Sequence, residues 1–370
     1  MSGDVTSEPA GMGDARAFSL VVWHSLMWLS FCCAVGVLLS VLLLVPSLGV
    51  ILEPFSYGRW MTVHLNASLY GWSSLPLIGL LFMQYLPRDT RARAGESAVG
   101  VWSGVLLFAC AGWLSGQTSG KLFMEWTGLS RWAIAGSMAW LAAALGVSLV
   151  QRMRSVPGET RWLIAGKFAL LSCLSTIPVV MYRAADPQFY PPINPDSGGA
   201  TGGSLLGSTL ALVMIFWFLP FILQRPRRSA ARFFIVTGLL LALHSAWFAV
   251  LDHGDRSHHE PAQIVALASL AIWVPVLIAH LRGFEWPRET LRWLLAFAAW
   301  GAALTLNGIV SFLPGVLEHA KFTNAMVAHV HVAMAGMITQ FNMLLLVLFT
   351  RRAVLIALLV CLIPTTIAGL

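Results

Sequence analysis

Long apolar segments separated by short polar ones run along the whole chain. Each segment is about twenty residues long, which is the length that a helix needs to cross a hydrocarbon layer roughly 30 Å thick. A membrane β-barrel would instead alternate polar and apolar residues, and these segments do not. The pattern predicts transmembrane helices at about 17–44, 60–86, 98–116, 132–151, 162–182, 203–224, 232–252, 262–281, 291–314, 323–349 and 353–370.

Composition supports the same interpretation. Of 370 residues, 58% are apolar and 11% are charged, whereas a water-soluble domain has about a quarter of its residues charged. The sequence therefore predicts an all-α integral membrane protein, a polytopic bundle of about eleven transmembrane helices. Residues 1–16 form a polar N-terminal tail, and 17–370 form a single transmembrane domain. No internal repeat stands out.

Positive charge is distributed unevenly between alternate loops. Fifteen arginines lie in the loops that follow the second, fourth, sixth, eighth and tenth predicted spans, and six Arg or Lys residues lie in the opposite loops. The positive-inside rule then places the N-terminus in the cytoplasm. The membrane that we expect is a bacterial-type inner membrane. The net charge of +7 is explained by this asymmetry, so no nucleic-acid partner is expected.

In this orientation, histidines concentrate toward the outer face. Eight of the ten lie there, and a histidine at membrane depth needs a partner. His329 and His331 are two residues apart, so on a helix their imidazoles point about 200° apart. Opposed imidazoles suit two cofactors on opposite sides of one helix, and His64 lies at a similar depth on another span. Haem with histidine axial ligands is the simplest chemistry that fits. His24, His253 and His280 are more readily explained as interhelical or interfacial hydrogen-bonding residues.

Four motifs at these residues resemble subunit I of the haem–copper oxidase superfamily, nearest the cbb-type oxidases and nitric oxide reductases. They are Gly58-Arg59 followed by His64-Leu65-Asn66-Ala67, the segment Gly120-Lys121-Leu122-Phe123-Met124-Glu125-Trp126, His258-His259 fourteen residues after His244, and Ala328-His329-Val330-His331. The resemblance implies a twelve-helix fold of three arcs.

The resemblance also implies a role for each matching residue. His64 and His331 would be the axial ligands of a low-spin haem, and His329 the proximal ligand of a high-spin haem, both b-type. His258 and His259 would be catalytic ligands of copper or non-haem iron, and Glu125 would lie near the haem propionates and a calcium site. The implied function is that of a respiratory terminal oxidase, which receives electrons from a cytochrome c or cupredoxin-type subunit, reduces oxygen and assembles with other membrane subunits.

The sequence departs from the family at the metal site. The stretch where a third copper histidine is expected reads Gly198-Gly199-Ala200-Thr201-Gly202-Gly203-Ser204, and Asp252 stands where the family has a tyrosine. His244 or His253 would have to supply the missing ligand. Three alternatives to oxygen reduction stay open: nitric oxide reduction at a non-haem iron beside Asp252, Asp255 and Glu260, electron relay without catalysis, and transport.

Overall fold

The structure, a computed structural model, describes residues 16–87, 93–121, 123–155, 160–189, 205–227, 231–251, 260–320 and 323–349. These ranges are helical apart from their loops and one isolated β-bridge between Pro226 and Phe284. The α-helices are α1 (Arg16–Leu44), α2 (Ser47–Ile51), α3 (Tyr57–Ala67), α4 (Ser74–Tyr85), α5 (Arg93–Leu114), α6 (Gly128–Ser155), α7 (Arg161–Ala184), α8 (Leu205–Leu223), α9 (Ala231–Leu251), α10 (Pro261–Ser269), α11 (Trp273–Arg282), α12 (Leu291–Ser311), α13 (Val316–Ala320), α14 (Asn324–His331) and α15 (Thr339–Phe349). The π-helical segments η1 (Ser68–Ser73) and η5 (Val332–Ile338) and the 3₁₀ segments η3 (Leu270–Ile272) and η4 (Arg288–Thr290) lie between them.

The helices confirm a multi-pass membrane protein. Within the described residues, eight helices are long and apolar enough to cross a membrane. Large apolar side chains also point outward: Trp162 on α7 is 88% exposed and Leu243 on α9 is 70% exposed. Such surfaces suit lipid rather than water. Ten of the predicted spans coincide with a helix or an unbroken series of helical segments, and the eleventh, 353–370, lies outside the described residues. The total of eleven therefore stays a prediction.

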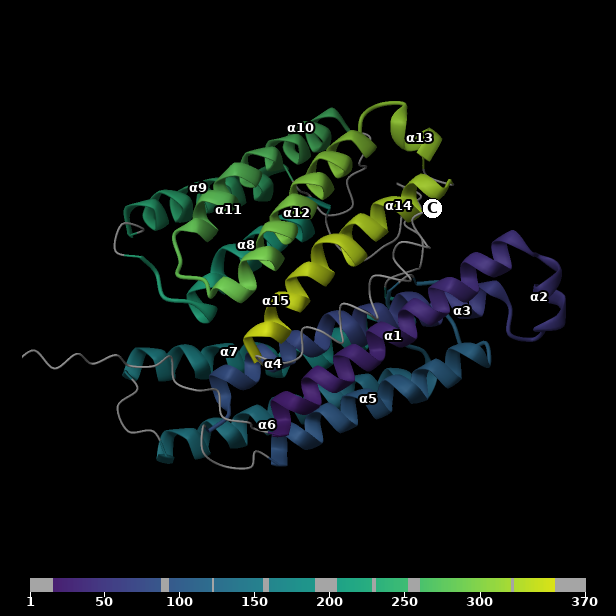
Figure 1. The fold of residues 1–370 in the computed structure, drawn as a ribbon, viewed down its shortest axis with the longest axis horizontal. Helices are drawn as coiled ribbons and strands as arrows, with labels where there is room; N and C mark the ends of the chain where they lie inside the picture. Colours follow the sequence, from purple (N-terminus) through teal and green to yellow (C-terminus); the bar gives the residue numbers. More distant parts are fainter. Residues whose placement is uncertain are drawn as a thin grey trace, which may run out of the picture. The chain divides into compact units, whose positions relative to one another are not determined.

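Two compact units divide the chain, one containing residues 1–190 and 345–370, the other residues 191–344. In the first unit, α1, α3 and α5 lie side by side (Figure 1). Its core contains large aromatic side chains that are also hydrogen-bonded: the Trp28 indole donates to Ser103, and the Trp102 indole donates to the Tyr70 carbonyl. Indoles bonded in this way fix the register between neighbouring helices. The single domain predicted for residues 17–370 stays a prediction.

The second unit is built from α8 to α14 and the first part of α15. Its buried core forms where α8, α9, α10 and α11 meet and contains Leu210, Leu241, Phe248, Ala266, Leu267, Leu270 and Trp273. On another side of the unit, α12 packs along α14 and η5 (Figure 1). This last packing positions two of the predicted ligand histidines.

One structural arrangement occurs twice along the chain, and we call it the histidine repeat. In each copy, a long helix is followed by a five-residue helix, then by a helix that carries a histidine, a π-helical segment and a further α-helix. The first copy is α1, α2, α3, η1 and α4, and the second is α12, α13, α14, η5 and α15. The two copies place His64 and His329 at matching positions.

The match between the copies extends to single contacts. Gly71 lies seven residues after His64, and a Cβ added there would be 2.6 Å from Trp28; Gly336 lies seven residues after His329, and its added Cβ would be 2.7 Å from Trp300. Both glycines are therefore required where the π-helical segment packs against the long helix.

Each π-helical segment also ends in the same way. The hydroxyl groups of Ser74 and Thr339, ten residues after His64 and His329, donate to the carbonyls of Leu69 and Met334 at 2.8 and 2.9 Å. In both copies the accepting carbonyl lies five residues earlier in the chain. A hydroxyl in this position donates a hydrogen bond to a carbonyl oxygen of the π-helical segment, where the spacing of the main-chain hydrogen bonds changes.

Candidate functional site

His64 is held between α3 and α1. Its Nδ1 donates to the carbonyl of Cys32 at 2.9 Å. Gly36, one turn further along α1, lies directly under the ring: an added Cβ would be 3.1 Å from His64 Cε1. The half-buried imidazole therefore occupies space that any residue other than glycine would fill at this position of α1.

His329 is held in a similar way between α14 and α12. Its Nδ1 donates to the side-chain oxygen of Asn307 at 2.6 Å. Gly308, the next residue on α12, faces the ring, and an added Cβ would be 3.5 Å from His329 Cε1. The spacing of this glycine from Trp300 equals that of Gly36 from Trp28, so the long helices of the two copies also match.

His331 faces a different side of α14. It is exposed, and its Nδ1 donates to the carbonyl of Val327, one turn earlier in the same helix, at 2.8 Å. His329 instead bonds across to α12. The two imidazoles therefore lie on different faces of α14, as their i, i+2 spacing requires.

All three histidines have the same tautomer. A carbonyl or amide oxygen can only accept, so each ring carries a proton on Nδ1, and in the neutral imidazole the lone pair is then on Nε2. Metal-binding histidines have this arrangement, in which one ring nitrogen donates to an oxygen and fixes the orientation of the other. His319 on α13 is exposed and donates to the Gly315 carbonyl within its own segment, as His331 does to the Val327 carbonyl, so this hydrogen bond alone does not distinguish His331 from His319. The donor set at His64, His329 and His331 therefore fits axial ligation of haem iron.

His244 is bonded through both ring nitrogens. The Trp273 indole donates to its Nδ1 at 2.7 Å, so Nε2 carries the proton and donates to Ser269 Oγ at 2.7 Å. This histidine ties α9 to α10 and α11 inside the core. The arrangement argues against its use as the third copper ligand.

His24 and His280 also make interhelical contacts. Nδ1 of His24, on α1, lies 2.8 Å from Ser103 Oγ on α5. His280 is fully buried, and its Nε2 donates to the Trp217 carbonyl at 2.8 Å, with the rings stacked at 5.8 Å. Both contacts agree with the hydrogen-bonding role expected for these two residues from the sequence.

Glu125 lies buried in the loop between α5 and α6. Its carboxylate accepts from the main-chain N–H and the hydroxyl of Ser119 at 2.5 and 2.9 Å. Its own N–H donates to Asn66, two residues after His64, at 3.4 Å. The Tyr70 hydroxyl in η1 holds the same loop through the carbonyl of Phe123, whose φ of +61° is unusual for a bulky residue. The loop is therefore fixed to the helix that carries His64, which supports a structural role; the calcium site predicted here stays a prediction.

Lys121 joins this loop to the end of α7. Its buried ammonium donates to the Ala184 carbonyl. Burial lowers the pKa of Lys121, and the nearby charges of Asp186 and Glu125 oppose that effect. The contact supplies a cation to the C-terminal end of a helix, where it is electrostatically favourable.

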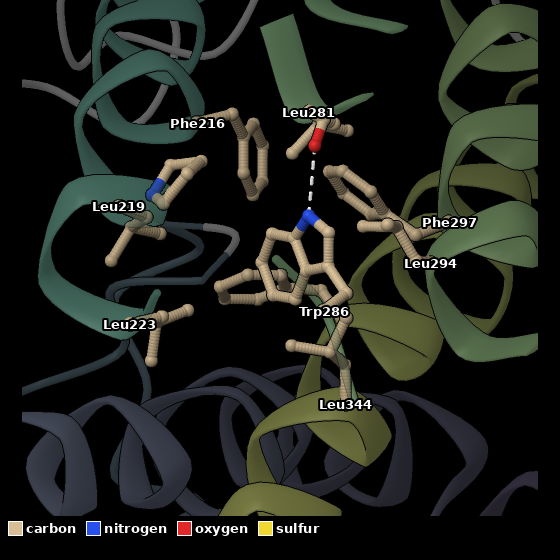
Figure 2. A pocket seen from close by; sticks show the side chains of 10 residues that line it. Phe216, Leu219, Leu223, Leu281, Trp286, Leu294, Phe297 and Leu344 are labelled. Atoms are coloured by element: carbon tan, nitrogen blue, oxygen red, sulfur yellow. Dashed lines mark hydrogen bonds between the residues drawn. The ribbon is translucent and has the colours of Figure 1, made fainter. Parts of the chain in front are cut away.

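A small cavity in the second unit is not a cofactor site. Figure 2 shows Trp286 pointing into it, with its indole donating to the Leu281 carbonyl at 2.8 Å. The lining residues are Phe216, Leu219, Pro220, Leu223, Leu281, Trp286, Leu294, Phe297, Phe341 and Leu344. Its volume of about 10 Å³ has room for about one water molecule. No histidine lines it.

The structure does not test whether several predicted site residues lie close to one another. His258, His259 and Asp252 lie outside the described residues. Among the residues that are described, no three His, Cys, Asp or Glu side chains form a group that could hold a metal ion. His64 and Glu125 belong to the first unit and His329 and His331 to the second, so the pairing of His64 with His331 on one haem stays a prediction.

Comparison with known proteins adds no assignment. No protein-family model matches the chain, and no curated protein does. The family suggested by the motifs therefore enters below as a proposal that rests on the residues themselves.

Proposed function

We propose that this protein is a haem-binding, subunit I-like component of a respiratory terminal oxidase. His64, His329 and His331 would be the axial ligands, with His64 and His331 on a low-spin haem and His329 on a high-spin haem. Bound haem would supply one-electron transfer and, at the high-spin position, oxygen reduction. Electrons would come from a cytochrome c or cupredoxin-type subunit in a larger membrane complex.

The observation that carries the proposal is the histidine repeat. His64 and His329 occupy matching positions, each donates from Nδ1 to a neighbouring helix, and each ring lies beside a glycine of that helix. A histidine that merely joined two helices would not explain why a glycine beside the ring, a π-helical segment and a hydroxyl recur at the same spacing in both copies. The repeated arrangement orients an imidazole through a hydrogen bond at Nδ1, as metal-binding histidines are oriented.

Orientation in the membrane is part of the proposal. The arginine-rich loops would lie in the cytoplasm of a bacterial inner membrane, with the N-terminus on the same side. His64, His329 and His331 would then lie toward the outer face, where an external electron donor can reach the haems.

Electron relay without catalysis is the second candidate. His244 is already bonded through both nitrogens, which removes one of the two substitutes for the missing copper ligand. A relay needs only the haem ligands. A nitric oxide reductase-like subunit, with non-haem iron at His258 and His259, is the remaining enzymatic alternative.

Single histidine variants test the ligand assignment. We expect His64→Ala and His329→Ala each to lose about one haem per chain, measured as the pyridine haemochrome of the purified protein. His331→Ala should convert a low-spin spectrum to a high-spin one or lose that haem. His319→Ala is the matched control, because His319 is exposed and donates from Nδ1 within its own segment as His331 does but lies outside the motifs that carry the resemblance, and it should retain all haem. Full haem content in both His64→Ala and His329→Ala would refute the assignment.

A further inference from the structure

The two copies of the histidine repeat differ in the group that accepts the Nδ1 proton. His64 donates to the main-chain carbonyl of Cys32, whereas His329 donates to the side-chain amide of Asn307. The Cys32 carbonyl belongs to the middle of α1, so its strength as an acceptor is fixed by the helix. The acceptor for His329 is set by the choice of one side chain and can vary with the sequence.

Asn307 lies on an apolar surface of α12. Its neighbours Leu306 and Val310 are 58% and 51% exposed, and Asn307 is exposed as well. A polar amide on a lipid-facing helix surface is unfavourable unless it is hydrogen-bonded. Its side-chain oxygen accepts from His329 at 2.6 Å, a short distance for an N–H donor. The contact with His329 therefore accounts for a polar residue at this position.

The acceptor behind a ligating histidine determines how strongly that histidine donates to a metal. A stronger acceptor draws the Nδ1 proton away from the ring and makes Nε2 more basic, and a more basic ligand favours the oxidised iron. We propose that Asn307 is a positioning residue that orients His329 and sets the reduction potential of the haem bound there. The inference rests on the haem-binding function proposed above.

Two substitutions of Asn307 change the acceptor in opposite directions. Asn307→Leu keeps the approximate shape of the side chain and removes the acceptor. Asn307→Asp keeps the shape and supplies a carboxylate, one turn from the end of α12 at Ser311. Thr305→Val is the matched control, because it removes a hydroxyl from the same helix that bonds only within that helix, to the Gly301 carbonyl at 2.9 Å.

The experiment is a potentiometric titration of each purified variant, followed through the visible spectra of the two haems. Asn307→Leu should raise the midpoint potential of one haem by at least about 59 mV, which is a tenfold change in the equilibrium constant of its one-electron reduction. Asn307→Asp should lower the same midpoint. The other haem should keep its wild-type midpoint in both variants and thereby report correct folding, and Thr305→Val should leave both haems unchanged.

Three results would overturn the inference while leaving haem binding intact. These are wild-type midpoints in both Asn307 variants, an equal shift of both haems, or loss of the same haem from both variants, since aspartate can still accept the proton. Absence of haem from the wild-type protein would instead refute the proposed function, so the two failures are distinguishable.

Discussion

Alanine at Gly36 and alanine at Gly308 should affect haem binding differently. The added Cβ would lie 3.1 Å from His64 Cε1 in the first case and 3.5 Å from His329 Cε1 in the second. Carbon atoms pack best at about 3.5–4.0 Å. Gly36→Ala therefore forces the His64 ring to move by a few tenths of an ångström, whereas Gly308→Ala makes an ordinary contact.

The size of the effect follows from the hydrogen bond that the movement disturbs. The bond from His64 to Cys32 is 2.9 Å long, and losing such a bond costs about 0.5–1.5 kcal/mol. This corresponds to a roughly two- to ten-fold weaker retention of the haem at His64. Both substitutions also favour their helices by about 1 kcal/mol relative to glycine, so that contribution cancels when the two variants are compared.

Haem retention can be compared by incubating each purified variant with excess apomyoglobin and following haem transfer over time. We expect faster transfer of one haem from Gly36→Ala and wild-type behaviour for Gly308→Ala. Equal haem loss from both variants, or no loss from either, would show that the spacing between glycine and imidazole does not determine ligand position.

Two further predictions concern stability. Gly71→Ala places a Cβ 2.6 Å from Trp28 and should lower the free energy of unfolding by about 1–3 kcal/mol. Adding Trp28→Leu to the same chain should recover part of this loss in denaturant titrations. Additive effects of the two substitutions would contradict the contact. The backbone N–H of Gln188 and the guanidinium of Arg131 hold the pKa of Asp186 below its ordinary value of 3.8, so its stabilising contribution is present above pH 3.8 and is lost as the pH falls from there toward the lowered pKa. Asp186→Asn should therefore reduce the acid dependence of Tm in that range, and an unchanged profile would count against the ion pair.

The helices could be predicted from the sequence because apolar length alone determines where a chain can cross a membrane. The predicted spans 60–86 and 323–349 each correspond to a series of helical segments with a π-helical segment inside it. Hydropathy averaged over a whole span does not reveal this interruption, because the π-helical segments are only six and seven residues long. The spacing of His329 and His331 did predict that they face different sides of α14.

The histidine repeat was missed because few residues that define it are identical. The spacing is the same in Met61, His64 and Gly71 as in Met326, His329 and Gly336. It is also the same in Trp28 and Gly36 as in Trp300 and Gly308. Ser74 and Thr339 share a hydroxyl group, and most other positions share at most apolar character, which every transmembrane helix has. The matching glycines were the available signal, since Gly36, Gly71 and Gly336 are each required by a close contact with a residue far away in the sequence.

The hydrogen-bond partners of the histidines also could not be predicted from the sequence. His64 uses a main-chain carbonyl, which any residue at position 32 would provide. His244 looked available as a metal ligand because its partner Trp273 is 29 residues away. Asn307 lies 22 residues before His329 on another helix, so its role depends on how α12 packs against α14.

Haem binding is the central claim, and the most direct test is the reduced-minus-oxidised spectrum of the purified wild-type protein, with and without carbon monoxide and with iron and copper counted per chain. The account predicts two b-type haems. A carbon monoxide shift with one extra metal would identify a working oxidase or reductase, and two haems without either would identify a relay. A protein purified from its native membrane without haem iron would contradict the assignment of His64, His329 and His331 and would favour a transporter.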